Sequence, residues 1–256
     1  MGRLQGQVAI ITGSGSGIGQ GIAKRLASEG ANIVINYVGH GEGAAETLKM
    51  VEAAGARGIV VQADVSEVEA VQSLVEKAWQ EFGSADILVN NAGVETNTSF
   101  LDAKEEDFER IIGVNLKAPF FVTQAFVRKL AAEKKPGRII NISSVHEDMA
   151  FPGFATYCAS KGGLRMLMRN LCVELGPLGI TINNIAPGAI ATPINKQLLE
   201  DKPKLDALLE QIPLGRLGTV EDVAALAAYL ASEDAAYITG ATYYVDGGLS
   251  RYYHEQ

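Results

Sequence analysis

Cysteine, positive charge and long apolar runs are scarce in this sequence. The only cysteines among 256 residues are Cys158 and Cys172, which lie too far apart along one predicted helix to form a disulfide and lack the spacing of metal ligands. No apolar run is long enough to span a bilayer, and the N-terminus shows no apolar signal region. With 22 basic and 30 acidic residues the net charge is −8, which argues against nucleic acid or an anionic membrane as a partner. We therefore expect a cytoplasmic protein with free thiols and no metal site.

Short apolar strands alternate with amphipathic helices along the chain, and no linker separates them. Such alternation favours right-handed crossovers and a parallel sheet covered by helices on both faces. The sequence thus predicts a single α/β domain over residues 1–256, doubly wound, with a small helical lid at about 189–214 that contains two short helices interrupted at Pro203. Strands are predicted at 8–11, 32–36, 58–62, 86–89, 138–142, 180–185 and 241–245, and the main helices at 44–54, 68–82, 104–131, 155–175 and 220–231, besides one after the glycines at 13–19.

A glycine-rich turn joins the first strand to the first helix. It reads Thr12-Gly13-Ser14-Gly15-Ser16-Gly17-Ile18-Gly19. Glycines let the backbone pass close to a ligand, and the helix N-terminus behind them offers unpaired N–H groups to a pyrophosphate. Between a strand and a helix, this turn favours nucleotide binding over a purely structural turn.

Tyr157 and Lys161 form the second candidate site. They are four positions apart in a predicted helix, so both side chains project from one helical face. An ammonium close to a phenol stabilises the phenolate and lowers its pKa, which would let Tyr157 move protons. Ser144 follows a predicted strand, where its hydroxyl could bond a substrate oxygen, and the apolar neighbours of Asn115 favour a buried role for that side chain. Because the pair alone is common in helices, its context decides.

These motifs together resemble the short-chain dehydrogenase/reductase family over essentially the whole length. The family's order and spacing are met by Thr12-Gly13-x-x-x-Gly17-x-Gly19, Asn90-Asn91-Ala92-Gly93, Asn115, Ser144, Tyr157-x-x-x-Lys161 and Pro187-Gly188. Within the family the chain is most similar to bacterial glucose 1-dehydrogenases, through the runs at 90–95, 142–147 and 187–195. The resemblance implies a Rossmann-like fold and oxidoreductase activity with NAD or NADP.

The resemblance also implies the role of each matching residue. In the catalytic group Ser144 bonds the reacting oxygen, Tyr157 transfers the proton, Lys161 bonds the nicotinamide ribose and lowers the tyrosine pKa, and Asn115 positions a water. The implied cofactor contacts are Gly13, Ser16, Gly17, Ile18, Gly19, Tyr37, His40, Asp64, Val65, Asn91, Ala92, Gly93, Tyr157, Lys161, Pro187, Gly188, Ile190 and Thr192.

The end of the second strand leaves the choice of cofactor open. NAD-selective relatives carry an acid there, whereas this chain reads Asn36-Tyr37-Val38-Gly39-His40. An arginine that follows this tyrosine in similar dehydrogenases is Val38 here. His40 is the one group left that could meet a 2′-phosphate, and it could equally be an ordinary loop residue. We expect both NADP and NAD to be used.

A substrate site is predicted from Glu95, His146 and Asn195, each of which follows a motif residue, besides Ser144 and Tyr157. A sugar with several hydroxyls needs several converging donors and acceptors. Glu95 and Asn195 could also be ordinary polar loop residues, and Glu147 is expected to be solvated.

Three functions remain open at this point. The first is oxidation of β-D-glucose or a related aldose to its lactone. The second is reduction of 3-oxoacyl thioesters or small ketones, although the acidic chain offers no docking patch for an acidic carrier protein. The third is a nucleotide-binding module without catalysis, which the complete catalytic group disfavours. A homo-oligomer, by resemblance a tetramer, is expected, with the apolar helix 155–175 at a subunit contact.

Overall fold

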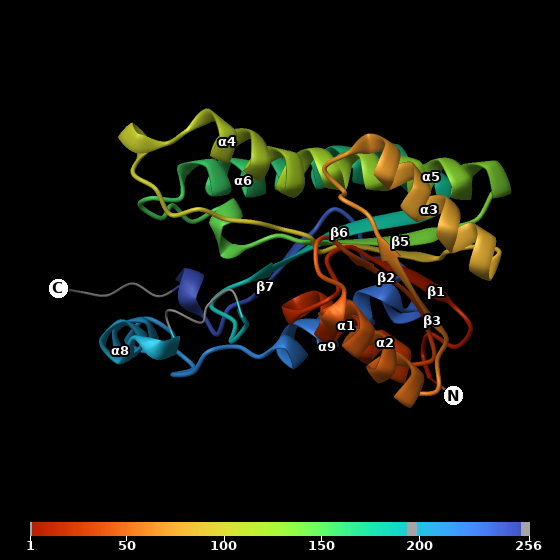
Figure 1. Ribbon diagram of the computed structural model, residues 1–256, viewed down its shortest axis with the longest axis horizontal. Helices are drawn as coiled ribbons and strands as arrows, with labels where there is room; N and C mark the ends of the chain where they lie inside the picture. Colours follow the sequence, from red (N-terminus) through yellow and green to blue (C-terminus); the bar gives the residue numbers. More distant parts are fainter. Residues whose placement is uncertain (1, 194–198, 252–256) are drawn as a thin grey trace.

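One seven-stranded parallel sheet forms the centre of the molecule (Figure 1). The computed structural model describes residues 2–193 and 199–251. The strand order is β3-β2-β1-β4-β5-β6-β7, so the direction of winding reverses between β1 and β4. The strands are β1 (Val8–Ile11), β2 (Asn32–Tyr37), β3 (Gly58–Gln62), β4 (Ile87–Asn90), β5 (Gly137–Ile142), β6 (Ile180–Pro187) and β7 (Thr242–Val245).

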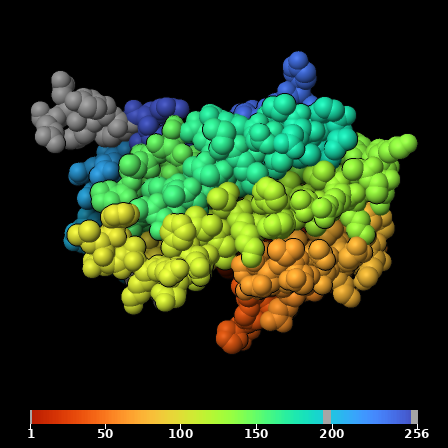
Figure 2. Space-filling model, turned by 90° about the horizontal axis from the view of Figure 1, so that it is seen from above, coloured from red at the N-terminus to blue at the C-terminus, as the bar shows by residue number. Residues whose placement is uncertain are grey.

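Helices cover both faces of this sheet (Figure 1). On one face lie α1 (Gly17–Ser28), α2 (Glu42–Ala53) and α9 (Val220–Ala231). On the other lie α3 (Val68–Phe82), α4 (Glu105–Ile112), α5 (Ala118–Glu133) and α6 (Ala155–Leu175). Seen from above, α3, α5 and α6 run side by side across the second face (Figure 2). The doubly wound α/β architecture expected from the alternating pattern is therefore confirmed.

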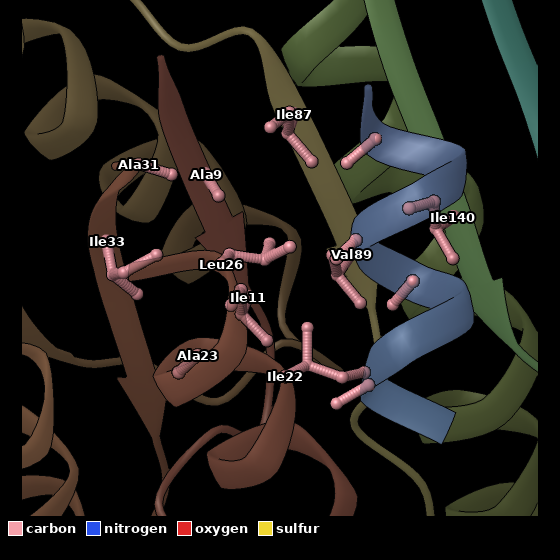
Figure 3. Close-up of a cluster of buried hydrophobic side chains, with 14 of the residues drawn as sticks. Ala9, Ile11, Ile22, Ala23, Leu26, Ala31, Ile33, Ile87, Val89 and Ile140 are labelled. Atoms are coloured by element: carbon pink, nitrogen blue, oxygen red, sulfur yellow. The ribbon is translucent and has the colours of Figure 1, made fainter. Parts of the chain in front are cut away.

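The central strands are apolar along their whole length because both of their faces are covered. All four residues of β1 and of β4 are buried. Ile11 and Val89 point to the first face, where they meet Ile22 and Leu26 of α1 and the inner side of α9 (Figure 3). Ile10 and Leu88 belong to the second cluster, under α3, α5 and α6. Two cores therefore fix the register of the strands, whose carboxyl ends all meet at one edge.

The helix expected at 104–131 is interrupted. α4 ends at Ile112, a π-helical turn follows at Gly113–Lys117, and α5 begins at Ala118. The inserted turn carries the fully buried Asn115. Pro119, in the first turn of α5, has no N–H to donate to the Asn115 carbonyl, so the α-helical hydrogen-bond pattern is broken at this turn.

One further expectation needs correction. β6 continues through Pro187, which pairs with Val245 of β7, instead of ending at residue 185. The break expected at Pro203 is present: residues 199–200 are helical, the helix is broken at Asp201, and Pro203 lies in the first turn of α8 (Lys202–Glu210). The earlier helix expected from residue 195 falls mostly outside the described residues.

α6 buries only one side within this chain. Leu164 and Met168 face the sheet, whereas Met166 and Val173 on the outer side are 62% and 74% exposed. Both cysteines are free thiols. In the part of the chain that the structure describes, no helix is long and apolar enough to cross a membrane.

Candidate active site

Hydrogen bonds from Thr12 and Asn91 join the glycine turn to the end of β4. The Thr12 hydroxyl accepts from the backbone N–H groups of Asn91 and Ala92, at 2.9 and 3.1 Å. The Asn91 amide donates back to the carbonyls of Thr12 and Gly13, at 2.9 and 3.0 Å. The turn is therefore held against the strand at which the winding reverses, where open α/β sheets bind their ligands.

Two of the glycines are required by this geometry. Gly13 has φ +62°, and a Cβ there would lie 2.9 Å from the Cα of Ala92. At Gly19 a Cβ would collide with the Asn91 side chain. Behind them, α1 begins after Ser16 with no side-chain cap, so its first N–H groups stay open to a ligand. This cradle fits the pyrophosphate of a dinucleotide.

A cavity of about 970 Å³ opens beside the turn. The residues that line the cavity extend from α1 past the end of β3 to the π-turn, so the cavity is long enough to hold a dinucleotide. Ten of the predicted cofactor contacts line it: Gly13, Ser16, Gly17, Ile18, Asp64, Val65, Asn91, Ala92, Gly93 and Thr192. Val38, Ala63, Ser66, Val94, Phe108, Val114 and Lys117 line it as well and were not predicted. Phe108 belongs to α4 and Val114 and Lys117 to the π-turn, while the other four lie in the loops that follow β2, β3 and β4.

The end of β2 differs from the expectation. Tyr37 and His40 do not line the cavity, whereas Val38 does and is 67% exposed. The Tyr37 hydroxyl lies 3.5 Å from Gln62 Oε1. Asn36 is fully used in the fold, because its Oδ1 accepts from Gly13 N at 3.1 Å and its amide donates to the Ala63 carbonyl at 3.0 Å. No charged group of β2 or its loop thus faces the place expected for a ribose 2′-substituent, among the residues that the structure describes.

The segment after β6 passes from the sheet to the rim of the cavity. Gly188 N donates to the Val245 carbonyl at 3.0 Å, which continues the pairing begun at Pro187. Ile190 is 3% exposed and packs in the first core, so its side chain points away from the cavity. Thr192 does line the cavity.

Asn115 is held by bonds from both ends of its amide. Its Oδ1 accepts from Val94 N at 2.9 Å, and its Nδ2 donates to the Val94 carbonyl at 2.8 Å and to Ser160 Oγ at 3.1 Å. These bonds tie the π-turn to the loop after β4 and to α6. The expectation of a buried Asn115 is confirmed; both N–H groups of its amide are used, Oδ1 can accept one further hydrogen bond, and its implied role in positioning a water stays a prediction.

Ser144, Tyr157 and Lys161 meet at the end of β5. Ser144 is 7% exposed, and its hydroxyl is hydrogen-bonded with the side chain of Tyr157. Lys161 is 3% exposed, and its Nζ donates to the carbonyl of Ile142, the last residue of β5, at 3.0 Å. The same Nζ lies 5.5 Å from the centre of the Tyr157 ring. The motif residues predicted from two separate segments, the end of β5 and α6, are thus brought together.

Burial shifts the pKa values of this pair toward their neutral forms. Desolvation raises the pKa of Tyr157 well above 10, while the hydrogen bond with Ser144 lowers it. Desolvation also lowers the pKa of Lys161 to about 8, against which Glu147 and Glu95 act. The resemblance implied that Lys161 lowers the tyrosine pKa. The net pKa of Tyr157 is nevertheless raised, because burial outweighs the other influences, and the Lys161 ammonium bonds the Ile142 carbonyl; the effect implied for Lys161 on the phenol stays a prediction.

Glu95 and His146 lie at the same site, while Asn195 falls outside the described residues. Desolvation raises the pKa of the Glu95 carboxyl, and His146 and Lys161 are close enough to lower it. The His146 Nδ1 is 3.1 Å from the Met149 carbonyl, and its ring packs with those of Phe151 and Phe154 at centroid distances of 5.3 and 6.1 Å. The ring of Tyr157 meets that of His146 edge-on, with the two ring centroids 5.9 Å apart. An aromatic wall therefore borders the phenol, which the sequence did not suggest.

Glu147 is buried, in contrast to the solvated position expected for it. Its side chain has no exposed surface, and Oε2 accepts from Asn184 Nδ2 at 3.0 Å. Oε1 lies 3.5 Å from Arg165 Nε. The correction has a clear cause, since the partners come from β6 and α6 and were not readable from the run at 142–147.

This fold, glycine cradle and Ser–Tyr–Lys group define an oxidoreductase that acts on CH–OH groups with a nicotinamide cofactor. A family model described as enoyl-(acyl carrier protein) reductase matches residues 13–250. The chain belongs to the short-chain dehydrogenase/reductase family.

Several relatives match over nearly the whole chain. 3beta-Hydroxysteroid dehydrogenase 1 of Eggerthella lenta is 45% identical over 97% of this chain and 95% of its own. Glucose 1-dehydrogenase 2 of Bacillus subtilis is 39% identical over 97% and 96%. The crystal structure of a gluconate 5-dehydrogenase from Burkholderia cenocepacia in complex with NADP and tartrate superposes with a TM-score of 0.92, at 37% identity and 98% coverage of both chains.

Proposed function

We propose that the protein is a dehydrogenase that oxidises the hydroxyl on a ring carbon of a sugar, most readily the anomeric hydroxyl of β-D-glucose, to give the lactone. The observation that carries this proposal is the position of the Glu95 carboxylate, close enough to Lys161 and His146 to interact with both. A sugar needs an acceptor for its other hydroxyls beside the reacting oxygen. The similarity to a glucose 1-dehydrogenase and to an L-rhamnose 1-dehydrogenase supports the choice of an aldose.

In this proposal each residue of the site has one role. Tyr157 takes the proton of the reacting hydroxyl, Ser144 orients that oxygen, and Lys161 supplies positive charge next to the phenol. Asn115 holds α6 and the loop after β4 in register. A nicotinamide bound in the cavity supplies the hydride acceptor. The protein's own contribution is to hold the substrate carbon, the phenol and the cavity in one geometry.

A second candidate substrate is a 3β-hydroxysteroid or another alcohol with a flat apolar ring face. The aromatic wall of His146, Phe151 and Phe154 favours it, because Phe151 is 49% exposed and packs on His146 and Phe154, the two rings that contact Tyr157, so that a ring system would cover it. The similarity to a 3beta-hydroxysteroid dehydrogenase supports this candidate. Reduction of 3-oxoacyl thioesters stays an alternative, although the net charge of −8 does not favour the docking of an acidic carrier protein.

Initial rates separate the candidates. The wild-type protein is tested on D-glucose, L-rhamnose and a 3β-hydroxysteroid with the oxidised cofactor, and on a 3-oxoacyl thioester with the reduced cofactor. The same rates are then measured for the variants Glu95→Gln and Phe151→Ala. Glucose oxidation that falls with Glu95→Gln and is kept by Phe151→Ala supports the sugar proposal. Steroid oxidation with the reverse dependence replaces it, and activity on the thioester alone rejects both.

We further propose that both cofactors are turned over and that the protein forms a homo-oligomer, by resemblance a tetramer, in the cytoplasm. Val38 supports dual use, because its uncharged side chain lines the cavity and neither repels nor binds a 2′-phosphate. The exposed Met166 and Val173 of α6 support a subunit contact there. A preference of a hundredfold or more for one cofactor in kcat/KM rejects dual use, and a monomeric mass in light scattering rejects the oligomer.

A further inference from the structure

Glu147 is a buried carboxylate that the dehydrogenase chemistry described above leaves unused. It lies in the short helix η3 (Val145–Glu147), which follows Ser144 directly. A fully buried charge is costly unless it is paired, so its partners indicate what it does. The ion pair with Arg165, at 3.5 Å, is loose: neither Glu147 Oε1 nor Arg165 Nε finds a hydrogen-bond partner among the described residues. Arg165 makes its shorter bond, 2.8 Å, to the exposed Asp148.

Glu147 is held mainly by a row of buried side-chain amides that runs across the carboxyl ends of the strands. Asn90 Nδ2 donates to Asn141 Oδ1 at 2.9 Å, and Asn141 Nδ2 donates to Asn184 Oδ1 at 3.0 Å. Asn184 in turn donates to Glu147 at 3.0 Å. Every donor in this row points toward the carboxylate, and each of the three asparagines is at most 3% exposed. The row thus orients three amide dipoles toward one negative group beside the catalytic candidates.

Glu147 lies against α6, 3.5 Å from Arg165, which is one helical turn beyond Lys161. Its negative charge raises the pKa of Lys161, as that of Glu95 also does. A buried carboxylate that favours the ammonium supports the proposed proton transfer. The other charged or titratable groups around Lys161 and Tyr157 are Cys158 and Arg165 of α6, His146 and Asp148 near η3, Tyr244 of β7 and Arg251 beyond it.

We propose that Glu147 is a positioning residue: its buried carboxylate, fixed by the Asn90–Asn141–Asn184 row, keeps Lys161 positively charged and holds the turn that carries Ser144 against β6. The inference rests on the proposed dehydrogenase activity of this site. It explains why a carboxylate is buried here at all, because an amide would complete the row equally well.

The pH profile of alcohol oxidation tests this role. With Glu147→Gln, which keeps the shape and removes the charge, the alkaline limb of kcat moves to lower pH by on the order of one pH unit. Glu147→Asp keeps the charge and restores the limb at least in part. Asp148→Asn is the matched control, since it removes an exposed neighbouring carboxylate of the same short segment, and it leaves the limb in place. Limbs at the wild-type positions in Glu147→Gln, with only a smaller amplitude, would overturn the proposal in favour of a purely structural role.

A double variant keeps the test decisive if Glu147→Gln alone does not fold. Glu147→Gln/Arg165→Gln removes both charges of this ion pair and is compared with Arg165→Gln. The alkaline limb of kcat is expected at lower pH in the double variant than in Arg165→Gln, and limbs at the same pH would overturn the proposal.

A second readout needs no catalysis. In the cofactor-free protein, the pH at which Lys161 loses its proton is measured by urea unfolding of each variant relative to its Lys161→Met counterpart. That pH falls below the wild-type value in Glu147→Gln, and an unchanged value overturns the proposal. Inactivity of the wild-type protein on every alcohol would reject the proposed function, while the unfolding result would still decide the role of Glu147.

Discussion

Lys161→Met is expected to stabilise the cofactor-free protein at neutral pH. Lys161 is 3% exposed, and burial lowers its pKa from the ordinary 10.5 to about 8. The unfolded chain therefore binds this proton more tightly than the folded protein. Below about pH 8 the charged lysine costs the fold about 3 kcal/mol, because one pH unit of such a difference corresponds to about 1.4 kcal/mol. The cost disappears as the pH rises toward the unfolded value.

The net gain is smaller than this cost. Methionine fills a similar volume but cannot donate to the Ile142 carbonyl, and that lost hydrogen bond takes back about 1 kcal/mol. We therefore expect Lys161→Met to be about 2 kcal/mol more stable than wild type at pH 7, and this advantage to fall by about 2 kcal/mol by about pH 9.5.

Urea unfolding of both proteins at equal concentration measures this difference at each pH. Groups common to the two proteins cancel in the comparison. Lys77→Met, at an exposed position on α3, controls for the change of residue type and should show no such pH dependence. A variant less stable than wild type at pH 7, or an advantage independent of pH, would refute the reasoning.

Three other changes probe the site. Tyr157→Phe should lower kcat for alcohol oxidation by roughly 100- to 10,000-fold while cofactor binding, followed by nucleotide fluorescence, persists; unchanged turnover would remove Tyr157 from the proton transfer. Val38→Arg should shift the ratio of kcat/KM toward NADP by roughly tenfold to a hundredfold, because Val38 lines the cavity and a guanidinium there could bond a 2′-phosphate; the cofactor ratio of Val38→Leu serves as the control. Gly13→Ala should destabilise the fold by about 1–3 kcal/mol more than Gly55→Ala in urea unfolding, since both glycines have positive φ but only Gly13 has a neighbour in the way, and equal losses would show that the contact with Ala92 is relieved at no cost.

The strands and the main helices could be predicted because their signals are local. A run such as Val8–Ile11 is apolar at every position, and in the structure it is buried on both faces. The break at Gly113–Lys117 does have a local mark in Pro119, in the first turn of α5, which the continuous helix predicted over 104–131 did not take into account. It accompanies the bonds between Asn115 and Val94, which lie 21 positions apart and meet only in the folded chain.

The candidate site also contains both kinds of feature, those that local motifs predict and those that depend on contacts made only in the folded chain. Ser144, Tyr157 and Lys161 were predicted from motif spacing, and the structure brings them together. The direction of the tyrosine pKa was not predictable, because the spacing of the motif says nothing about how much water reaches the phenol. Glu147 was misjudged for a related reason: it stands among polar residues in the sequence, while the amide that binds it comes from β6, 37 positions away.

The two carboxylates near Lys161 have opposite consequences for how the site can change. Glu95 stands at an exposed position, so replacing it alters the charge at the site without breaking a buried bond. Glu147 ends a row of buried amides, and replacing it by an apolar residue would leave the Asn184 amide without its acceptor. Substrate preference can therefore vary at Glu95 at little cost in stability, whereas the charge that supports Lys161 is tied to the integrity of the sheet edge. Glu95→Ala should accordingly change substrate preference with an unfolding free energy within about 0.5 kcal/mol of wild type, and Glu147→Ala should lose several times that amount in the same urea assay.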